Sequence, residues 1–157
     1  MKEIYLIRHA KSSWDSVYET DYDRPLNERG AREGPQVASF LAKKWGAPGI
    51  LISSPAIRAY QTAQFFRSSW GLPWSEFSLS PTLYEASIEN LRFTVLDGLE
   101  DRKSVAIVGH NPGLSILASE LCSKPCELKT SCAVRIRIGG SMDPGDGTLI
   151  EFVSPRK

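Results

Sequence analysis

The chain has little of the two residue types that most often build metal sites and disulfide frameworks. Of its 157 residues only two are histidine and three are cysteine. Cys122, Cys126 and Cys132 are odd in number and irregularly spaced, so the sequence predicts reduced thiols rather than a disulfide framework. Two thiols without a nearby histidine also make a poor zinc site, and no metal or other cofactor is expected.

Long apolar runs and a surplus of one charge are missing as well. No run approaches the roughly 18 apolar residues of a membrane span, and a strand is expected by residue 3, which leaves no room for a signal peptide. The 19 Lys and Arg residues nearly balance the 18 Asp and Glu residues, so the net charge of +1 gives no electrostatic footprint for nucleic acid or an anionic membrane. We therefore expect a cytoplasmic protein that binds neither nucleic acid nor a membrane.

The composition is that of an ordinary globular protein. Hydrophobic residues make up 41% of the chain and charged residues 24%, which excludes a disordered or fibrous class. A chain of 157 residues can hold one hydrophobic core, so a single domain over 1–157 is predicted. A monomer is expected.

Strand-like and helix-like segments alternate along the chain. Residues 3–8 and 104–108 are almost entirely apolar, which is typical of strands buried on both faces of a parallel sheet. Apolar residues three or four positions apart indicate the helices between such strands. Strands are predicted at 3–8, 50–53, near Ser78, at 104–108, 134–138 and 148–153, and helices from Asn27 to Trp45, from Ser54 to Trp70, over 88–99 and from Pro112 to Leu121. This order predicts a three-layer α/β/α sandwich around a mostly parallel sheet of about five or six strands.

Local signals place several element boundaries. Asn27 is expected to be a helix N-cap, and Ser54-Pro55 combines a cap with a proline at the first helical position. Pro35 removes a backbone hydrogen bond, so it either kinks its helix or marks the first turn. In 134–138 arginine alternates with apolar residues, which predicts a half-exposed strand at or near the sheet edge.

The two histidines occupy equivalent places, because each directly follows a predicted buried strand. His9 follows the first strand and His110 follows the strand at 104–108. In parallel α/β sheets ligand crevices open at the carboxyl ends of strands, so two imidazoles far apart in sequence are expected over one site. Arg8 adds a permanent cation beside the first of them, which predicts an anionic ligand.

A third segment has the same construction of a strand, polar residues and a helix start. It contains Ser53-Ser54-Pro55 and then Arg58, a cation in the first helical turn, where the helix dipole disfavours positive charge. Each feature alone has a structural explanation, as a hydrogen-bonded histidine, a solvated arginine or a helix cap. Together, Arg8, Arg58 and two helix N-termini predict a site that surrounds one phosphate, because a guanidinium group can donate two parallel hydrogen bonds to phosphate oxygens.

The motifs resemble those of the histidine phosphatase superfamily, the phosphoglycerate-mutase-like phosphatases. The resemblance rests on three stretches in order, 6–10, 53–63 and 108–112, which span most of the domain. Within that superfamily the stretches 8–14 and 23–26, together with the small size, are similar to the short phosphohistidine phosphatases of the SixA type. The chain lacks the length for a large cap domain.

The resemblance implies a role for each matching residue. His9 matches the nucleophile, which attacks phosphorus in line and becomes a transient phosphohistidine. Arg8 and Arg58 match the phosphate clamps, and His110 matches the second histidine that holds an equatorial oxygen in the transition state. Asn111 follows it, and its backbone N–H at the helix start is expected to help.

Other positions follow the family pattern less closely. Glu85 stands where the superfamily often keeps its proton donor, although a solvated loop carboxylate is the alternative. Ala10 stands where the superfamily usually has a glycine, directly after the Arg-His pair. Asp15 stands where the mutases carry a phosphate-contacting asparagine, and its charge predicts that it points away from a bound dianion. Arg24 or Ser12 is expected to supply the missing contact.

The sequence therefore favours a metal-independent phosphatase that uses a histidine nucleophile on phosphohistidine in proteins and binds phosphate or similar oxyanions. A phosphatase of small phosphoesters with the same site is the nearest alternative. A non-catalytic phosphate-binding module is a second alternative. A metalloenzyme that uses both histidines with Asp15 or Glu85 is a third, which the two flanking arginines disfavour.

Overall fold

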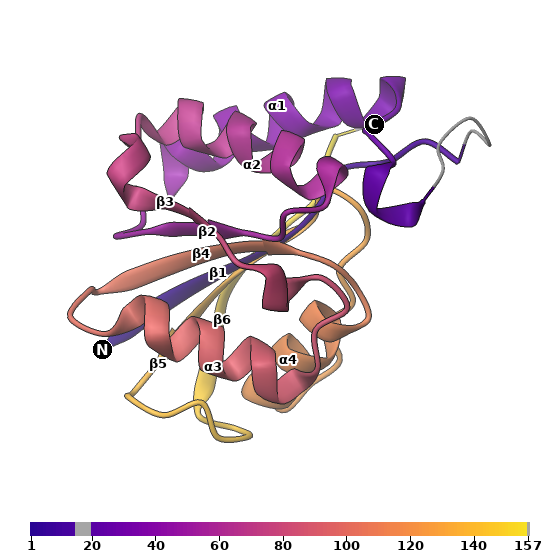
Figure 1. Ribbon diagram of the computed structural model, residues 1–157. Helices are drawn as coiled ribbons and strands as arrows, with labels where there is room; N and C mark the ends of the chain where they lie inside the picture. Colours follow the sequence, from indigo (N-terminus) through magenta and orange to yellow (C-terminus); the bar gives the residue numbers. More distant parts are fainter. Residues whose placement is uncertain (15–19, 157) are drawn as a thin grey trace.

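The computed structural model describes residues 1–14 and 20–156, and its elements form three layers (Figure 1). The strands are β1 (Lys2–Arg8), β2 (Leu51–Ser53), β3 (Phe77–Leu79), β4 (Ser104–Gly109), β5 (Ala133–Ile138) and β6 (Gly147–Val153). The helices are α1 (Glu28–Lys44), α2 (Ile57–Trp70), α3 (Ile88–Leu99) and α4 (Gly113–Cys122), with short 3-10 turns η1 (Asp21–Asp23), η2 (Trp74–Glu76) and η3 (Pro81–Leu83). Within the described residues, no helix is long and apolar enough to cross a membrane.

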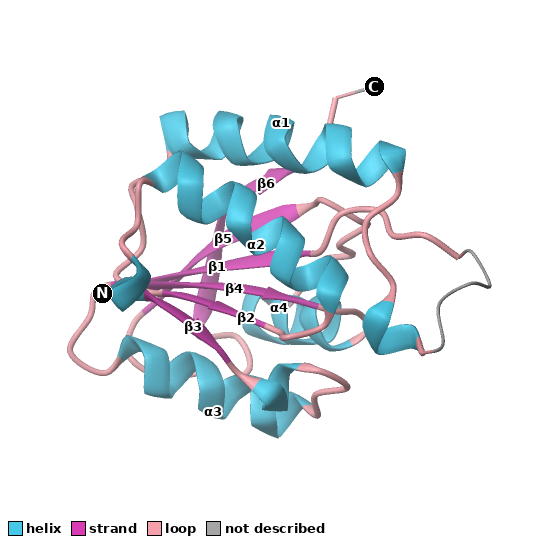
Figure 2. Cartoon of the chain, turned by 45° about the horizontal axis from the view of Figure 1, so that its top comes forward, coloured by secondary structure: helices cyan, strands magenta, loops and turns pink. Residues whose placement is uncertain are grey.

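The sheet has the strand order β3-β2-β4-β1-β5-β6. The first four of these strands are parallel, and β5 runs antiparallel to both of its neighbours. Helices α1 and α2 cover one face of the sheet, and α3 and α4 cover the other (Figures 1 and 2). The predicted α/β sandwich with a mostly parallel sheet is confirmed.

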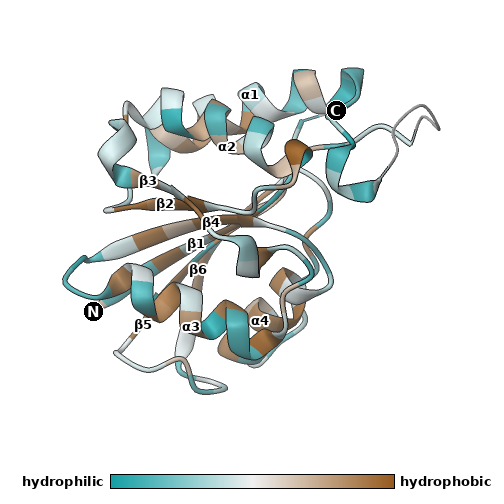
Figure 3. Ribbon diagram, in the orientation of Figure 1, coloured by the Kyte–Doolittle hydropathy of each residue, from teal (hydrophilic) through white to brown (hydrophobic). Residues whose placement is uncertain are grey.

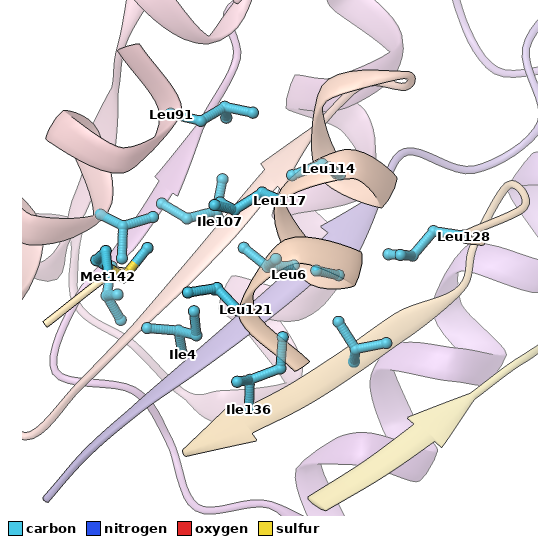
Figure 4. Packing of buried hydrophobic residues seen from close by; sticks show 14 of the residues in the cluster. Ile4, Leu6, Leu91, Ile107, Leu114, Leu117, Leu121, Leu128, Ile136 and Met142 are labelled. Carbon is cyan, nitrogen blue, oxygen red and sulfur yellow. The ribbon is translucent and has the colours of Figure 1, made fainter. Parts of the chain in front are cut away.

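Two apolar clusters hold the layers together, one on each face of the sheet. Alternate residues of β1 serve different clusters, with Leu6 on the α3 and α4 side and Ile7 on the α1 and α2 side. Brown, apolar residues lie along the central strands, whereas the helices carry both brown and teal residues (Figure 3). On the α4 side, Leu114, Leu117 and Leu121 pack onto the sheet (Figure 4). Each such side chain stabilises the fold by about 1.5–3 kcal/mol through burial.

The central strands end together, and this is what positions the site. In the sheet register Arg8 of β1 pairs with Gly109 of β4, and Ser53 of β2 pairs with Val108 of β4. The residues that follow these three parallel strands therefore leave the sheet at one edge.

Helix α1 begins where the sequence predicted and is docked onto the segment after β1. The Asn27 side chain accepts a hydrogen bond from the Gly30 N–H at 2.9 Å, which caps the helix. A Cβ at position 30 would overlap the carbonyl oxygen of Lys11, so only glycine lets the helix approach this closely. Pro35 lies inside the helix rather than at its start.

Two boundary predictions need correction or refinement. Helix α2 begins at Ile57 with Ala56 as its N-cap, so the predicted start at Ser54-Pro55 is wrong. The Ser54 hydroxyl accepts from the Ala56 N–H at 3.3 Å and also hydrogen-bonds His110, a tertiary contact that the local pattern does not reveal. Strand β5 lies one position inside the sheet edge, and its arginines are half-buried because Glu3 of β1 pairs with both of them.

Candidate active site

The strand ends bring the two histidines and an arginine of α2 into one cluster. The ring centroids of His9 and His110 lie 5.2 Å apart. The Nε of Arg58 approaches the Nε2 of His9 at 3.4 Å. Residues separated by about a hundred positions therefore meet at the carboxyl edge of the sheet, as the sequence predicted.

The imidazole of His9 is held in one tautomer. Its Nδ1 lies 2.7 Å from the carbonyl oxygen of Ala10, and because a carbonyl only accepts, Nδ1 must carry the proton. Nε2 then has the lone pair, which accepts a hydrogen bond from the Nε–H of Arg58 at 3.4 Å. The ring is buried, so His9 presents a neutral, oriented nitrogen on the side of Arg58.

One hydroxyl connects the nucleophile segment to α2. The Oγ1 of Thr62 accepts a hydrogen bond from the Ala10 N–H at 2.9 Å and donates to the Arg58 carbonyl oxygen at 2.8 Å. Thr62 thus connects the backbone of Ala10, whose carbonyl oxygen bonds His9, to the first turn of α2. Thr62 and Ala10 are both buried, so the contact is shielded from water.

Both histidines are kept uncharged by their surroundings. Burial is the main cause that lowers the pKa of His9 to about 3. His110, Arg58 and Arg8 lower this pKa further, whereas the hydrogen bond to Ala10 raises it. Burial also lowers the pKa of His110 to about 4, with the nearby arginines adding to the effect. A neutral imidazole can attack phosphorus, whereas an imidazolium cannot.

We predict that neither histidine titrates in the usual range in the folded protein. Because the chain has only two histidines, their Cε1–H signals are resolved in an NMR titration. Both signals should stay at neutral-form positions from about pH 8 to about pH 5, while unfolded histidine titrates near pH 6.5. The unfolded chain binds protons in this window and the folded chain does not, so the free energy of unfolding falls on acidification below about pH 6.5. A midpoint near 6.5 for either ring would contradict the burial described here.

Arg8 and His110 each have a buried polar atom without a partner among the described residues. Arg8 donates from Nη1 to the Leu128 carbonyl oxygen at 3.2 Å, while its buried Nε has no partner among the described residues. His110 shares its Nε2 with the Ser54 hydroxyl at 2.7 Å, and its buried Nδ1 is likewise unpaired there. Buried donors without partners are costly, which is consistent with a site built for a ligand.

The remaining predicted binding residues make contacts of their own. The Nη1 of Arg24 donates to the Ser12 hydroxyl at 2.7 Å, so these two residues are bonded to each other. The side chain of Asn111 donates to the Leu128 carbonyl oxygen and accepts from Ser115 at the start of α4. The predicted contact of Asn111 with an anion through its backbone N–H stays a prediction. Asp15 lies outside the described residues.

Glu85 lies beside His110. It is exposed, and it helps to line a pocket of about 280 Å³ whose wall also includes Leu83, His110 and Gly113. Its backbone has a φ of 55°, a left-handed conformation that is uncommon for residues other than glycine. Glu85 lies in the segment after η3, and such local strain is frequent at functional positions.

Sequence reasoning missed three residues of this site. Asp21 binds both Arg24 and Arg58, and the Tyr84 hydroxyl donates to Asp21 at 2.8 Å. The Tyr84 ring also packs edge-on against His110, with centroids 5.6 Å apart. Ser54 was assigned only to a helix cap. The spacing of Asp21 and Arg24, three apart, was an available signal for an ion pair. Within residues 1–14 and 20–156, no group of three or more His, Cys, Asp or Glu side chains could hold a metal ion.

The model of the histidine phosphatase superfamily (branch 1) matches residues 4–92, more than half of the chain. The chain belongs to the histidine phosphatase superfamily. It is 27% identical over 157 residues to the phosphohistidine phosphatase SixA of Escherichia coli, an alignment that covers 98% of this chain and 94% of that protein. It is also 28% identical over 170 residues to an uncharacterized chloroplastic protein of Arabidopsis thaliana, covering 98% of this chain and 78% of that one.

Solved structures give the same result. The putative phosphohistidine phosphatase SixA of Agrobacterium tumefaciens superposes with a TM-score of 0.85 at 27% identity, covering 98% of both chains. A structure of the protein histidine phosphatase SixA complexed with tungstate also gives a TM-score of 0.85, at 25% identity, and covers 98% of this chain and 97% of that chain. This member of the superfamily is thus a phosphatase, a hydrolase with a SixA-like fold.

Proposed function

We propose that this phosphatase hydrolyses phosphohistidine in proteins, with His9 as a covalent nucleophile and without a metal ion. The observation that carries the proposal is the pose of His9, whose Nδ1–H is held by Ala10 while Nε2 lies 3.4 Å from Arg58. A nucleophile beside a guanidinium is suited to an attack on a phosphoryl group. Similarity to SixA over nearly the whole chain supports phosphohistidine as the substrate class.

The reaction takes place in two balanced steps. In the first, His9 Nε2 attacks phosphorus, the bond from phosphorus to the substrate imidazole breaks, and the leaving nitrogen takes up a proton from solvent. In the second, water attacks the phosphorus on His9, the new P–N bond breaks, and inorganic phosphate leaves. The Nδ1–H stays bonded to the Ala10 carbonyl throughout, which stabilises the positive charge that the ring gains on phosphorylation.

The positive charge for the transition state comes from side chains of the chain itself. Arg8 and Arg58 are proposed to hold equatorial phosphoryl oxygens, with the charge that an in-line transfer requires. His110 is proposed to hold a third oxygen with the backbone N–H of Asn111, and Ser54 orients the His110 ring. Tungstate bound to a SixA structure is consistent with an oxyanion site in this fold.

An open site suits a histidine on a protein surface. The described elements all belong to the sheet, to its two helical layers or to the connections between them. This supports the proposal that residues 1–157 form one domain without a large cap. A substrate histidine displayed on another protein could then reach His9, while a small metabolite would have fewer contacts.

A substrate comparison tests the proposal. We expect kcat/KM for a phosphohistidine peptide to exceed that for phosphoserine, phosphotyrosine and sugar phosphates, with activity unchanged by EDTA and inhibited by vanadate. A higher kcat/KM for any small phosphoester would transfer the assignment to that substrate. Activity that is lost in EDTA and restored by a divalent ion would refute the metal-free mechanism. A protein that binds vanadate but turns over none of these substrates would support the binding-module alternative.

Phosphatase activity on small phosphoesters is a second candidate, which the position of Glu85 favours. Glu85 shares a pocket wall with His110, and it is proposed to protonate the leaving oxygen of a phosphoester. We predict that Glu85→Gln lowers kcat/KM for a phosphoester by roughly 10²–10⁴-fold, because an alkoxide must be protonated as it leaves. With phosphohistidine the loss should be about tenfold or less, since imidazole is a far weaker base than an alkoxide.

The control is Glu89→Gln, a carboxylate in the first turn of α3 that is exposed and lies outside the pocket wall. Both substrates should be turned over normally by that variant. Equal large losses on both substrates with Glu85→Gln would mean that Glu85 does more than donate a proton. No loss on either would make it a bystander.

A further inference from the structure

Asp21, at the start of η1, joins two arginines and a tyrosine that come from separate parts of the chain. Its Oδ1 accepts from Nε and Nη2 of Arg24 at 3.0 and 2.8 Å. Its Oδ2 accepts from Nη2 of Arg58 at 2.9 Å and from the Tyr84 hydroxyl at 2.8 Å. Its backbone carbonyl accepts from Nη1 of Arg58 at 2.7 Å. The loop before α1, the helix α2 and the segment after η3 therefore meet at one side chain.

The hydrogen-bonding capacity of this carboxylate is used up. Two carboxylate oxygens offer about four lone-pair positions, and four donors already point at them. Burial raises the pKa of Asp21, but hydrogen bonds from Tyr84, Arg24 and Arg58 outweigh it and hold that pKa below its usual range. The group stays ionised and has no position left for a substrate atom or a catalytic proton.

The contacts fix the orientation of Arg58. Both of its Nη atoms donate to Asp21, one to the side chain and one to the backbone. Because a guanidinium is planar, anchoring both Nη atoms also sets the direction of Nε, which faces His9 Nε2. Arg24 in turn anchors Asp21, and its remaining Nη1 is bonded to the Ser12 hydroxyl and the Ser13 carbonyl.

We propose that Asp21 is a positioning residue that holds Arg58 in the pose that binds phosphate. The inference rests on the proposed function only through the role of Arg58 as a phosphate clamp. It also gives Arg24 and Ser12 a function in support of Asp21, in place of the direct phosphate contact that the sequence suggested. Tyr84 contributes the fourth hydrogen bond and connects this cluster to His110.

Two effects of removing the Asp21 charge oppose each other, and this makes the proposal testable. A negative charge near an anion site weakens anion binding, so electrostatics alone predicts tighter binding when it is removed. Loss of the anchor frees the Arg58 side chain and predicts weaker binding. The Asp21 side chain is 48% exposed while that of Arg58 is 7% exposed, so solvent screens the charge and the loss of orientation dominates.

The experiment measures tungstate affinity by calorimetry for the full chain and for Asp21→Asn. We expect Asp21→Asn to weaken binding by roughly tenfold or more, as misplacing a binding group does. The matched control is Asp23→Asn in the same 3-10 turn, because among the described residues the Asp23 side chain bonds Thr20 and not Arg24, Arg58 or Tyr84. That variant should bind within about twofold of the wild type.

A double-mutant cycle with Arg58→Ala separates positioning from a general loss of stability. Asp21→Asn should weaken binding in the wild-type background and should not weaken it further once Arg58 is absent. Tighter binding by Asp21→Asn would mean that Asp21 competes with phosphate, and unchanged binding would mean that it has no role. Either result overturns the proposal.

Two further arms keep the test decisive. If Asp21→Asn does not fold, Tyr84→Phe, which removes one bond to Asp21 and keeps its charge, should still weaken tungstate binding by about two- to threefold, and no change there would overturn the proposal. Wild-type protein that fails to bind tungstate, or Arg58→Ala that binds it normally, would instead refute the proposed phosphate clamp.

Discussion

Replacing His9 by alanine is expected to abolish turnover of every phosphorylated substrate, with kcat falling on the order of 10⁴-fold or more, as for other covalent nucleophiles. The reason is that the described site offers one oriented lone pair beside the clamp, His9 Nε2, which the Ala10 carbonyl keeps unprotonated by holding the proton on Nδ1. The His110 ring is held differently, because its Nε2 is bonded to Ser54 and its Nδ1 has no partner among the described residues to fix its tautomer.

The matched variant is His9→Asn, which keeps a polar group of similar reach and should also be inactive. Both variants should melt cooperatively and retain tungstate binding through Arg8 and Arg58. Residual activity above about a tenth of wild type in either variant would contradict a covalent role for His9.

Arg58→Ala is expected to cost about 2–4 kcal/mol in kcat/KM, the usual loss for a charged donor that acts in the transition state. Arg58 is buried, its Nε faces the nucleophile, and both Nη atoms are held by Asp21, so it is already oriented before a substrate arrives. The loss should appear in kcat as well as KM, because charge on the phosphoryl oxygens rearranges as the bond breaks.

The control for that experiment is Arg32→Ala, which removes the same charge from an exposed position on α1. Its effect on kcat/KM should stay below about 0.5 kcal/mol, as for other surface charges. A similarly small effect of Arg58→Ala would return Arg58 to the status of a structural ion pair with Asp21.

Several features of the fold and site follow from local patterns. The apolar strands, the Asn27 cap and the stop at Gly71 are each encoded within a few neighbouring residues. The convergence of Arg8, His9 and His110 follows from a general property of parallel sheets, whose carboxyl ends meet at one edge. Such features could be predicted because they do not depend on which side chains meet across the fold.

The features that escaped prediction depend on tertiary contacts. Ser54 has an ordinary capping sequence, yet its hydroxyl is bonded to His110, which follows β4, the neighbour of β2 in the sheet. Asp21 and Tyr84 lie far apart in sequence and meet because the loop before α1 and the segment after η3 both pass over Arg58. The spacing of residues within one segment does not predict a contact between two distant segments. For Arg24 the sequence predicted a contact with phosphate, whereas its observed partners include Asp21 and Ser12.

Trapping the phosphoenzyme tests the central claim most directly. Phosphorus-labelled phosphohistidine peptide is mixed with enzyme, quenched within milliseconds in alkaline denaturant, which preserves phosphoramidates, and the labelled residue is identified by mass spectrometry. The account predicts label on His9, formed faster than phosphate is released and absent from His9→Asn. Label on Ser12 or on a cysteine, or phosphate release with no labelled enzyme at any time, would contradict it.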